Sequence, residues 1–283
     1  MTPLRQKMID AMVVRGFAVR TQKSYLEAVT QLAKFTHRSP DTLSRDDIQA
    51  FFLYLAKDRH LAGASCRLYL NGVRFLFTQV LAREDFDFAV PIPKKAQRIP
   101  ELLSRQDIAK LLNAVPNHKH RMMFTTCYAC GLRVSELVML QVRHIDSGNG
   151  YLRVDQGKGM KDRHVTLTPT LLDQLRQYWR IYHPIQWLFY SRDPLDRCSI
   201  NTVQRLFQQA KARAGIDKIG GIHSLRHAYA THQLEMGMPL HQLQQMMGHS
   251  SLSTTQRYMH WVPHYSPNKG GDLLAGLEVR HGH

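Results

Sequence analysis

The sequence predicts a mainly α-helical protein of two domains, with a small β-sheet in the second domain. Three observations support this fold class. Apolar residues recur at helical spacing through the first 85 residues, a proline-rich stretch interrupts the pattern at residues 86–100, and only two short segments later resemble strands. With 283 residues, 43% of them hydrophobic and 21% charged, the chain is long enough to bury two ordinary cores.

The first predicted domain, residues 1–85, is built from helices alone. Three of its stretches carry apolar residues at helical spacing, and the second begins behind a Ser44–Asp47 capping pattern. The predicted helices span residues 21–35, 44–55 and 65–80. The stretch 86–100 reads FDFAVPIPKKAQRIP and combines three prolines with three basic residues. It has no helical period, so we expect an extended linker between the domains.

Residues 101–283 form the second predicted domain, which combines helices with a hairpin. Ser104 marks the start of its first helix, and Gly131 is suited to end the next one. YLRV at 151–154 and HVTL at 164–167 flank a glycine-containing turn, which is typical of a β-hairpin. The predicted helices span residues 104–112, 120–130, 170–182, 199–214, 224–236 and 239–247.

The net charge indicates a polyanionic partner. Lys and Arg number 38 against 22 Asp and Glu, which gives a formal charge of +16. Residues 1–100 hold 16 basic and nine acidic side chains, and the remainder hold 22 and 13. Basic residues that neutralise phosphates release counterions, so both domains are suited to contact nucleic acid. The alternative at this point is a generally basic protein with no particular partner.

Composition excludes several classes of protein. No run approaches the ~20 apolar residues that span a bilayer, and the first stretch of the chain is too charged for a signal peptide. The four cysteines, Cys66, Cys127, Cys130 and Cys198, are too few for a disulfide scaffold in a chain of this length. We therefore expect a cytoplasmic protein that has no membrane association.

Two blocks in the second domain place a basic residue at a turn. GLRVSEL at 131–137 puts Arg133 between two helices, with Ser135 as the expected cap of the second. An arginine there is suited to bind a phosphate, although a surface ion pair is its more ordinary role. GKGMKDR at 157–163 is flanked by strands, so it is no Walker A loop and puts Lys158 at a hairpin tip. A solvated basic turn is its ordinary interpretation.

A third block, HSLRHAYATH at 223–232, puts His223 and Arg226 on one face of a helix. His223 and His227 are also spaced as two zinc ligands would be. The HExxH pattern and a third ligand are missing, so we expect no metal there.

The fourth block, MGHSSLSTTQRY at 247–258, contains His249 and Tyr258. Taken alone, a tyrosine in such a segment is more often packed than reactive. Cys127 and Cys130 form a CxxC pair, but no second pair accompanies them. We interpret these two cysteines as small apolar residues on a helix.

Together the four blocks resemble the tyrosine recombinase, or phage integrase, family. They occur in the family's order with matching local sequence, and the helical first domain and basic linker fit its two-domain plan. The resemblance covers nearly the whole chain and is nearest to Xer-like and integrase-like members associated with mobile elements. The six matching site residues are Arg133, Lys158, His223, Arg226, His249 and Tyr258.

The resemblance implies a metal-independent reaction with DNA. Tyr258 would attack a phosphate to form a 3′-phosphotyrosyl link, while the two arginines hold the phosphate's other oxygens. Lys158 would protonate the 5′ oxygen that leaves, and His223 would help to accept the proton of the tyrosine. His249 would hydrogen-bond the phosphate. No acidic cluster suggests a two-metal site, so we expect no cofactor.

The resemblance also implies an architecture and partners. The expected clamp on double-stranded DNA combines a SAM-like core-binding domain at 1–85 with a mixed α/β catalytic domain at 101–283. We expect a homo-oligomer, dimeric on one site and tetrameric in the synaptic complex. Whether a second recombinase or an accessory DNA-bending protein is a further partner is left open by the sequence. The C-terminal tail, residues 264–283, would dock on a neighbouring protomer through Leu273, Leu274 and Leu277.

We therefore expect a site-specific recombinase that serves integration or excision of mobile elements, or resolution of dimers. Two alternatives keep part of the resemblance. A type IB topoisomerase-like enzyme shares much of the catalytic set, and only the joining of two different duplexes would separate it from a recombinase. A non-catalytic DNA-binding accessory factor would keep the clamp without the reaction, but all six site positions are intact.

Overall fold

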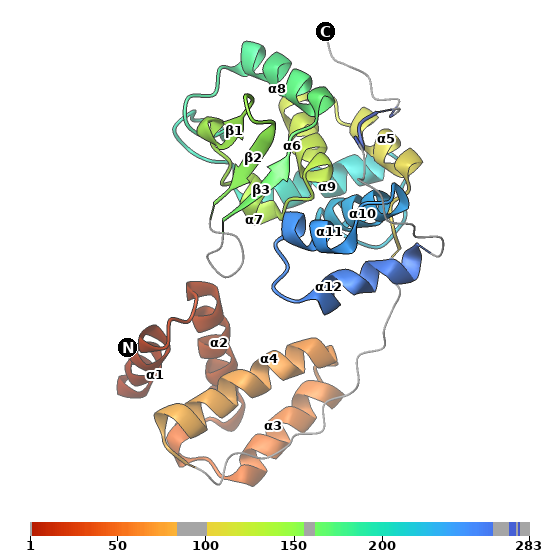
Figure 1. Ribbon diagram of the computed structural model, residues 1–283. Helices are drawn as coiled ribbons and strands as arrows, with labels where there is room; N and C mark the ends of the chain where they lie inside the picture. Colours follow the sequence, from red (N-terminus) through yellow and green to blue (C-terminus); the bar gives the residue numbers. More distant parts are fainter. Residues whose placement is uncertain (1, 84–100, 156–161, 263–271, 276, 278–283) are drawn as a thin grey trace. The chain divides into compact units, whose positions relative to one another are not determined.

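A computed structural model describes residues 2–83, 101–155, 162–262, 272–275 and 277, with the side chains of 260 and 261 excepted. The chain divides into two compact units, Met1–Arg98 and Ile99–His283 (Figure 1). Helices dominate both, and the second contains one small antiparallel sheet, which confirms the predicted fold class. The predicted linker at 86–100 lies entirely outside the described residues, so it stays a prediction.

The N-terminal unit packs helices around a core of its own. Its elements are α1 (Pro3–Val14), α2 (Val19–Thr36), the 3-10 turn η1 (Pro40–Thr42), α3 (Arg45–Lys57), α4 (Gly63–Arg74) and the π-turn η2 (Phe75–Val80). The predicted cap is confirmed, because Ser44 Oγ accepts from the Asp47 amide while the Asp47 carboxylate accepts from the Ser44 amide. Helix α1 was not predicted, because it buries only Met8 and Met12.

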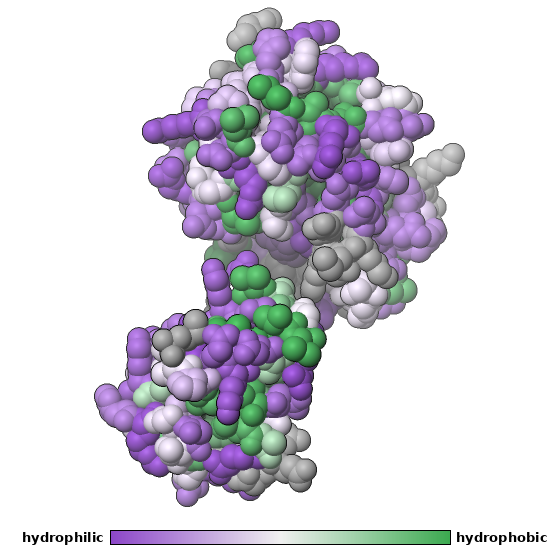
Figure 2. Space-filling view, turned by 90° about the vertical axis from the view of Figure 1, so that its left-hand side faces the viewer, coloured by the Kyte–Doolittle hydropathy of each residue, from purple (hydrophilic) through white to green (hydrophobic). Residues whose placement is uncertain are grey.

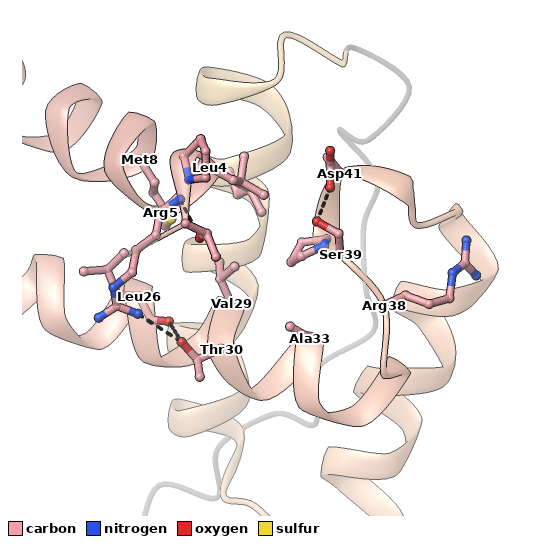
Figure 3. Close-up of a pocket in the computed structure, with 14 residues that line it drawn as sticks. Leu4, Arg5, Met8, Leu26, Val29, Thr30, Ala33, Arg38, Ser39 and Asp41 are labelled. Carbon is pink, nitrogen blue, oxygen red and sulfur yellow. Dashed lines mark hydrogen bonds between the residues drawn. The ribbon is translucent and has the colours of Figure 1, made fainter.

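The surface of this unit is partly apolar. On the face shown in Figure 2, apolar side chains gather over part of the N-terminal unit, whereas hydrophilic ones predominate over the C-terminal unit. A pocket lined by Leu4, Met8 and Val29 lies between α1 and α2, where the Arg5 guanidinium donates to Thr30 Oγ1 at 3.4 Å (Figure 3). None of the residues that line it belongs to the four blocks.

The C-terminal unit contains a three-stranded antiparallel sheet in the order β1–β2–β3. Its strands are β1 (Ile145–Asp146), β2 (Tyr151–Val154) and β3 (Arg163–Thr166). The hairpin of β2 and β3 confirms the prediction to within a residue, and Val154 pairs with Arg163 next to the turn. Strand β1 was not predicted, because two residues are too few to show alternation. Lys158, which stands between these two strands in the sequence, lies outside the described residues.

The helices of this unit surround a second core beside the sheet (Figure 1). They are α5 (Arg105–Asn113), α6 (His118–Ala129), α7 (Val134–Leu137), α8 (Pro169–Tyr182), α9 (Ile200–Arg213), α10 (His223–Glu235), α11 (Leu240–Met247) and α12 (Leu252–Gln256), with short helical turns η4 (Val142–His144) and η5 (Arg257–Trp261). Helices α6 and α10 are buried on nearly all sides and pack on each other. No helix in the described ranges has the length and apolar character needed to cross a membrane.

Gly131 sets how closely α6 and α10 approach. It ends α6 with a φ of +59°, in the left-handed region that glycine adopts without strain. A Cβ at this position would lie 2.4 Å from the ring of Tyr229 on α10. The missing side chain therefore lets the loop after α6 lie directly against α10, and its carbonyl reaches the guanidinium of Arg226.

The described part of the C-terminal tail lies on its own chain. Leu273 and Leu274 are buried in the core of the C-terminal unit, and Leu277 packs against the same core. The docking of this tail on a neighbouring protomer stays a prediction. The four cysteines are unpaired and buried, as interpreted for Cys127 and Cys130, and burial raises the pKa of each of these two thiols to about 12.

Candidate active site

Five of the six predicted site residues lie in the described part of the chain, and the fold brings them into one cluster. They come from four places: Arg133 before α7, His223 and Arg226 on α10, His249 after α11, and Tyr258 on η5. Helix α10 contacts α6, α11 and η5, so it is the element around which the cluster is assembled (Figure 1). The sixth residue, Lys158, lies outside the described residues.

Arg226 is the most deeply buried member of the cluster, with 1% of its surface exposed. Its guanidinium donates to the carbonyl oxygens of Gly131, at 2.6 Å, and Met247. A third hydrogen bond joins it to His249 Nε2 at 3.1 Å. Burial and the nearby charge of Arg133 lower the pKa of Arg226 to about 10, so the side chain is still a cation at neutral pH.

Glu136 supplies the negative charge that this cation needs. Its carboxylate accepts two hydrogen bonds from Arg163, at 2.9 and 2.7 Å, and one from the Arg133 guanidinium at 2.7 Å. The guanidinium of Arg226 is 3.9 Å away. Burial alone would raise the pKa of Glu136, but the hydrogen bonds and charges of Arg163 and Arg133 outweigh it and lower the pKa to about 2. One buried carboxylate therefore holds three arginines together.

Glu136 also corrects the predicted start of α7. The sequence suggested Ser135 as the helix cap, but α7 begins at Val134 and Arg133 occupies the cap position. The carboxylate of Glu136 accepts from the Arg133 backbone amide at 2.8 Å, in the way that an acidic residue three positions into a helix commonly does. The same carboxylate thus orients both the backbone and the side chain of Arg133.

The hydrogen bonds of His249 define which of its nitrogens carries the proton. An arginine can only donate, so Nε2 accepts from Arg226 and the proton lies on Nδ1, which is 2.9 Å from the hydroxyl of buried Thr255. Burial, followed by the charges of Arg226 and the neighbouring cations, lowers the pKa of His249 to about 4. In this state both ring nitrogens contact protein groups, and Nε2 presents a lone pair.

Tyr258 lies against this arrangement with 5% of its surface exposed. Its ring is nearly parallel to that of His249, at an interplanar angle of 6° and a centroid distance of 6.3 Å. Burial raises the pKa of its phenol, while the charges of Arg226 and Arg133 oppose that effect. The phenol oxygen is 2.9 Å from Nδ1 of His227, a residue that the sequence analysis considered only as half of a zinc pair.

His223 occupies the outer edge of the cluster. It is the first residue of α10 and is exposed, and its ring meets that of His227 edge to face at 4.8 Å. No group of three or more His, Cys, Asp or Glu side chains in the described ranges is arranged to hold a metal ion.

The cluster combines two arginines and a neighbouring phenol. Paired guanidinium groups bind the oxygens of a phosphoryl group, and a phenol beside them is a nucleophile that can attack phosphorus. Sequence reasoning identified these groups but missed Glu136, Arg163 and His227, whose importance comes from contacts across the fold. The one available signal was that Glu136 and Arg163 lie inside two of the quoted blocks.

Known proteins similar to this chain belong to one family. The sequence matches the phage integrase family over residues 101–264 and the phage integrase N-terminal SAM-like domain over residues 4–85. A protein of Sinorhizobium fredii whose name places it among integrase/recombinases is 43% identical, over 92% of this chain and 84% of that protein. The tyrosine recombinase XerD of Yersinia pestis is 34% identical, over 91% of this chain and 92% of XerD.

Two solved structures are also similar. The crystal structure of XerA recombinase has a TM-score of 0.53 at 28% identity, over 91% of this chain and 92% of the other. A lambda integrase dimer bound to a COC′ core site has a TM-score of 0.75 at 18% identity, over 99% of this chain and 79% of the other. At that identity, the second likeness concerns the fold alone.

Proposed function

The chain belongs to the phage integrase family and is a tyrosine-type site-specific DNA recombinase, and we propose that Tyr258 is its nucleophile. We further propose that Arg133 and Arg226 hold the scissile phosphate, and that Lys158 acts from the hairpin turn. The observation that carries this assignment is the position of a buried phenol beside the Arg226–Glu136–Arg133 cluster.

The proposed reaction conserves the energy of the DNA backbone. The phenol oxygen of Tyr258 attacks phosphorus and loses its proton, while the bond from phosphorus to the 5′ oxygen breaks. The two arginines stabilise the charge that develops on the non-bridging oxygens, and Lys158 gives a proton to the departing 5′ oxygen. The 5′ hydroxyl of another strand then reverses these steps and releases the tyrosine.

The geometry supports a specific role for the buried carboxylate. The three arginines around Glu136 carry more positive charge than one carboxylate neutralises. The excess positive charge favours binding of the singly charged phosphodiester, and still more its phosphorane-like transition state, which carries two negative charges. His249 Nε2, which accepts from Arg226 here, would have to gain a proton before it could donate to a phosphate, so its assigned role requires that change on DNA binding.

Covalent trapping tests the nucleophile. A nicked duplex that carries DNA flanking the gene is incubated with the protein and EDTA, and the products are separated on a denaturing gel. We expect a shifted protein–DNA band that is lost in Tyr258→Phe, while the variant still retains DNA in a native gel. Covalent attachment by the Tyr258→Phe variant would refute the assignment.

The proposed partners follow from the relatives. Structures of related recombinases contain DNA, and we propose double-stranded DNA as the partner of this chain, with a dimer on each site and a tetramer at synapsis. The free, buried cysteines and the DNA substrate support a cytoplasmic location. A two-plasmid assay separates recombination from relaxation, because a topoisomerase-like enzyme would remove supercoils without joining different duplexes.

A further inference from the structure

The contact between Tyr258 and His227 differs from the assignment that the family resemblance suggests. That assignment gives the proton of the tyrosine to His223, but the phenol oxygen lies 2.9 Å from Nδ1 of His227. His227 follows Arg226 directly and lies one helical turn after His223 on α10. The side chain next to the nucleophile is therefore a different histidine from the one expected.

We propose that His227 accepts the proton of Tyr258 during attack on DNA, and that His223 passes this proton toward solvent. The inference rests on the proposed function of Tyr258 as nucleophile. Two contacts carry it: the hydrogen bond between Tyr258 Oη and His227 Nδ1, and the edge-to-face packing of the His227 and His223 rings, with centroids 4.8 Å apart. The outer histidine, His223, is exposed to solvent.

The step is balanced without any further reactant. As the bond from Tyr258 Oη to phosphorus forms, the electron pair of the O–H bond stays on oxygen and the proton moves to His227 Nδ1. The bond from phosphorus to the 5′ oxygen breaks, and that oxygen takes a proton from Lys158. During rejoining, a proton returns from solvent through His223 to His227, and His227 gives it to the phenolate that leaves.

The surroundings keep His227 ready to accept. Burial, together with the charges of His223 and Arg226, lowers its pKa to about 4, so it is a neutral base at pH 7. Arg133 and Arg257 also lower the pKa of the Tyr258 phenol, and the ring of His249 lies parallel to the tyrosine ring. An incoming phosphate brings negative charge into this cationic cluster, and that charge raises the affinity of His227 for a proton when the phenol attacks.

The contact between His227 and Tyr258 could also serve only to position the phenol. Two substitutions distinguish this positioning role from that of a proton acceptor. His227→Gln keeps a hydrogen-bond acceptor near the phenol but has no basic nitrogen, whereas His227→Phe keeps the ring volume and removes the polar contact. Single-turnover cleavage is measured from pH 6 to 9.5 on a suicide duplex with a 5′-bridging phosphorothiolate. The 5′ sulfur of this substrate leaves as a thiolate and needs no proton. The measured rate therefore does not depend on proton donation by Lys158.

We expect His227→Gln to cleave about 10²-fold more slowly than the wild type at pH 7, which is within the usual range for loss of a general base. Its rate should rise about tenfold per pH unit, because it depends on the fraction of phenol already ionised. The wild-type rate should vary far less over this range. His227→Phe should be slower still, with the same dependence on pH.

One matched histidine variant serves as a control, and a second tests the relay. His232→Gln alters the same helix at a second tyrosine–histidine pair, in which His232 Nδ1 is 2.8 Å from Tyr128 Oη, and should keep the wild-type pH profile. His223→Gln should lower the rate by no more than about tenfold, because solvent can replace a relay.

Several outcomes would overturn the inference. These are a His227→Gln rate within threefold of wild type, a loss that is equal at every pH, or the full pH-dependent loss in His223→Gln instead. Failure of the nucleophile assignment would look different, because Tyr258→Phe would then still form the covalent complex.

Discussion

Replacing Glu136 by glutamine should destabilise the C-terminal unit strongly at neutral pH. The carboxylate has a pKa of about 2 in the folded chain against an ordinary value of 4.5, because Arg163 and Arg133 donate to it. Each pKa unit corresponds to ~1.36 kcal/mol, so the ionised form contributes about 3 kcal/mol of stability. This agrees with the ~3–5 kcal/mol lost when one partner of a buried ion pair is removed.

The pH dependence makes the prediction specific. A group whose pKa is lowered by folding contributes stability above its unfolded pKa and loses it as the pH falls through the folded value. The contribution of Glu136 should therefore be complete above pH 4.5 and disappear toward pH 2. A protonated Glu136 is electrically equivalent to the amide of the variant. The difference in stability between wild type and Glu136→Gln should thus shrink from about 3 kcal/mol at pH 7 to near zero at pH 2.

Tryptophan fluorescence during urea unfolding provides the assay. All three tryptophans, Trp179, Trp187 and Trp261, lie in the C-terminal unit, so the signal reports on that unit alone. With a denaturant dependence of about 2 kcal/mol/M, the midpoint should shift by roughly 1.5 M at pH 7. Glu235→Gln is the control, because burial raises the pKa of Glu235 and its charge contributes no stability. A loss below 0.5 kcal/mol for Glu136→Gln, or a gap that does not change with pH, would refute the reasoning.

Three further substitutions test other contacts. Gly131→Ala places a Cβ at positive φ against the ring of Tyr229 and should cost about 2–5 kcal/mol in the same unfolding assay; an unchanged midpoint would contradict the close approach of α6 and α10. Arg226→Lys keeps the charge but loses the forked donor, so single-turnover cleavage should fall at least ~10²-fold with a smaller effect on DNA binding. Thr255→Val leaves the Nδ1 proton of His249 without its acceptor and should cost about 1–3 kcal/mol, whereas Thr255→Ser should stay near wild type.

Local patterns accounted for most of the fold. The hairpin and the long helices follow from periodicity, and the serine caps at Ser44 and Ser104 form the predicted reciprocal hydrogen bonds with the acidic residue three positions on. The exceptions are short or weakly patterned elements. Helix α7 has four residues, and its first turn is organised by Glu136 rather than by a serine.

The site could be predicted as a set of chemical groups but not as a network. Arg226 and Tyr258 could be identified because the residues next to them in the sequence match short motifs of the family. The partners of these residues are distant in the chain, since Glu136 meets Arg163 across 27 positions and Tyr258 meets His227 across 31. Such pairs depend on how α10 packs against its neighbours, which the periodicity of any one segment does not reveal.

The covering of Tyr258 has a consequence for the timing of the reaction. With 5% of its surface exposed, Tyr258, the proposed nucleophile, is largely inaccessible to DNA that merely collides with the surface. On this proposal, a productive encounter begins with a rearrangement that uncovers the phenol to DNA while its contact with His227 is kept. At saturating DNA, the observed cleavage rate is then the rate of the uncovered state multiplied by the fraction of molecules in that state. If Tyr258 is the nucleophile, a molecule in the covered state does not cut DNA, and DNA that favours the uncovered state is cut faster.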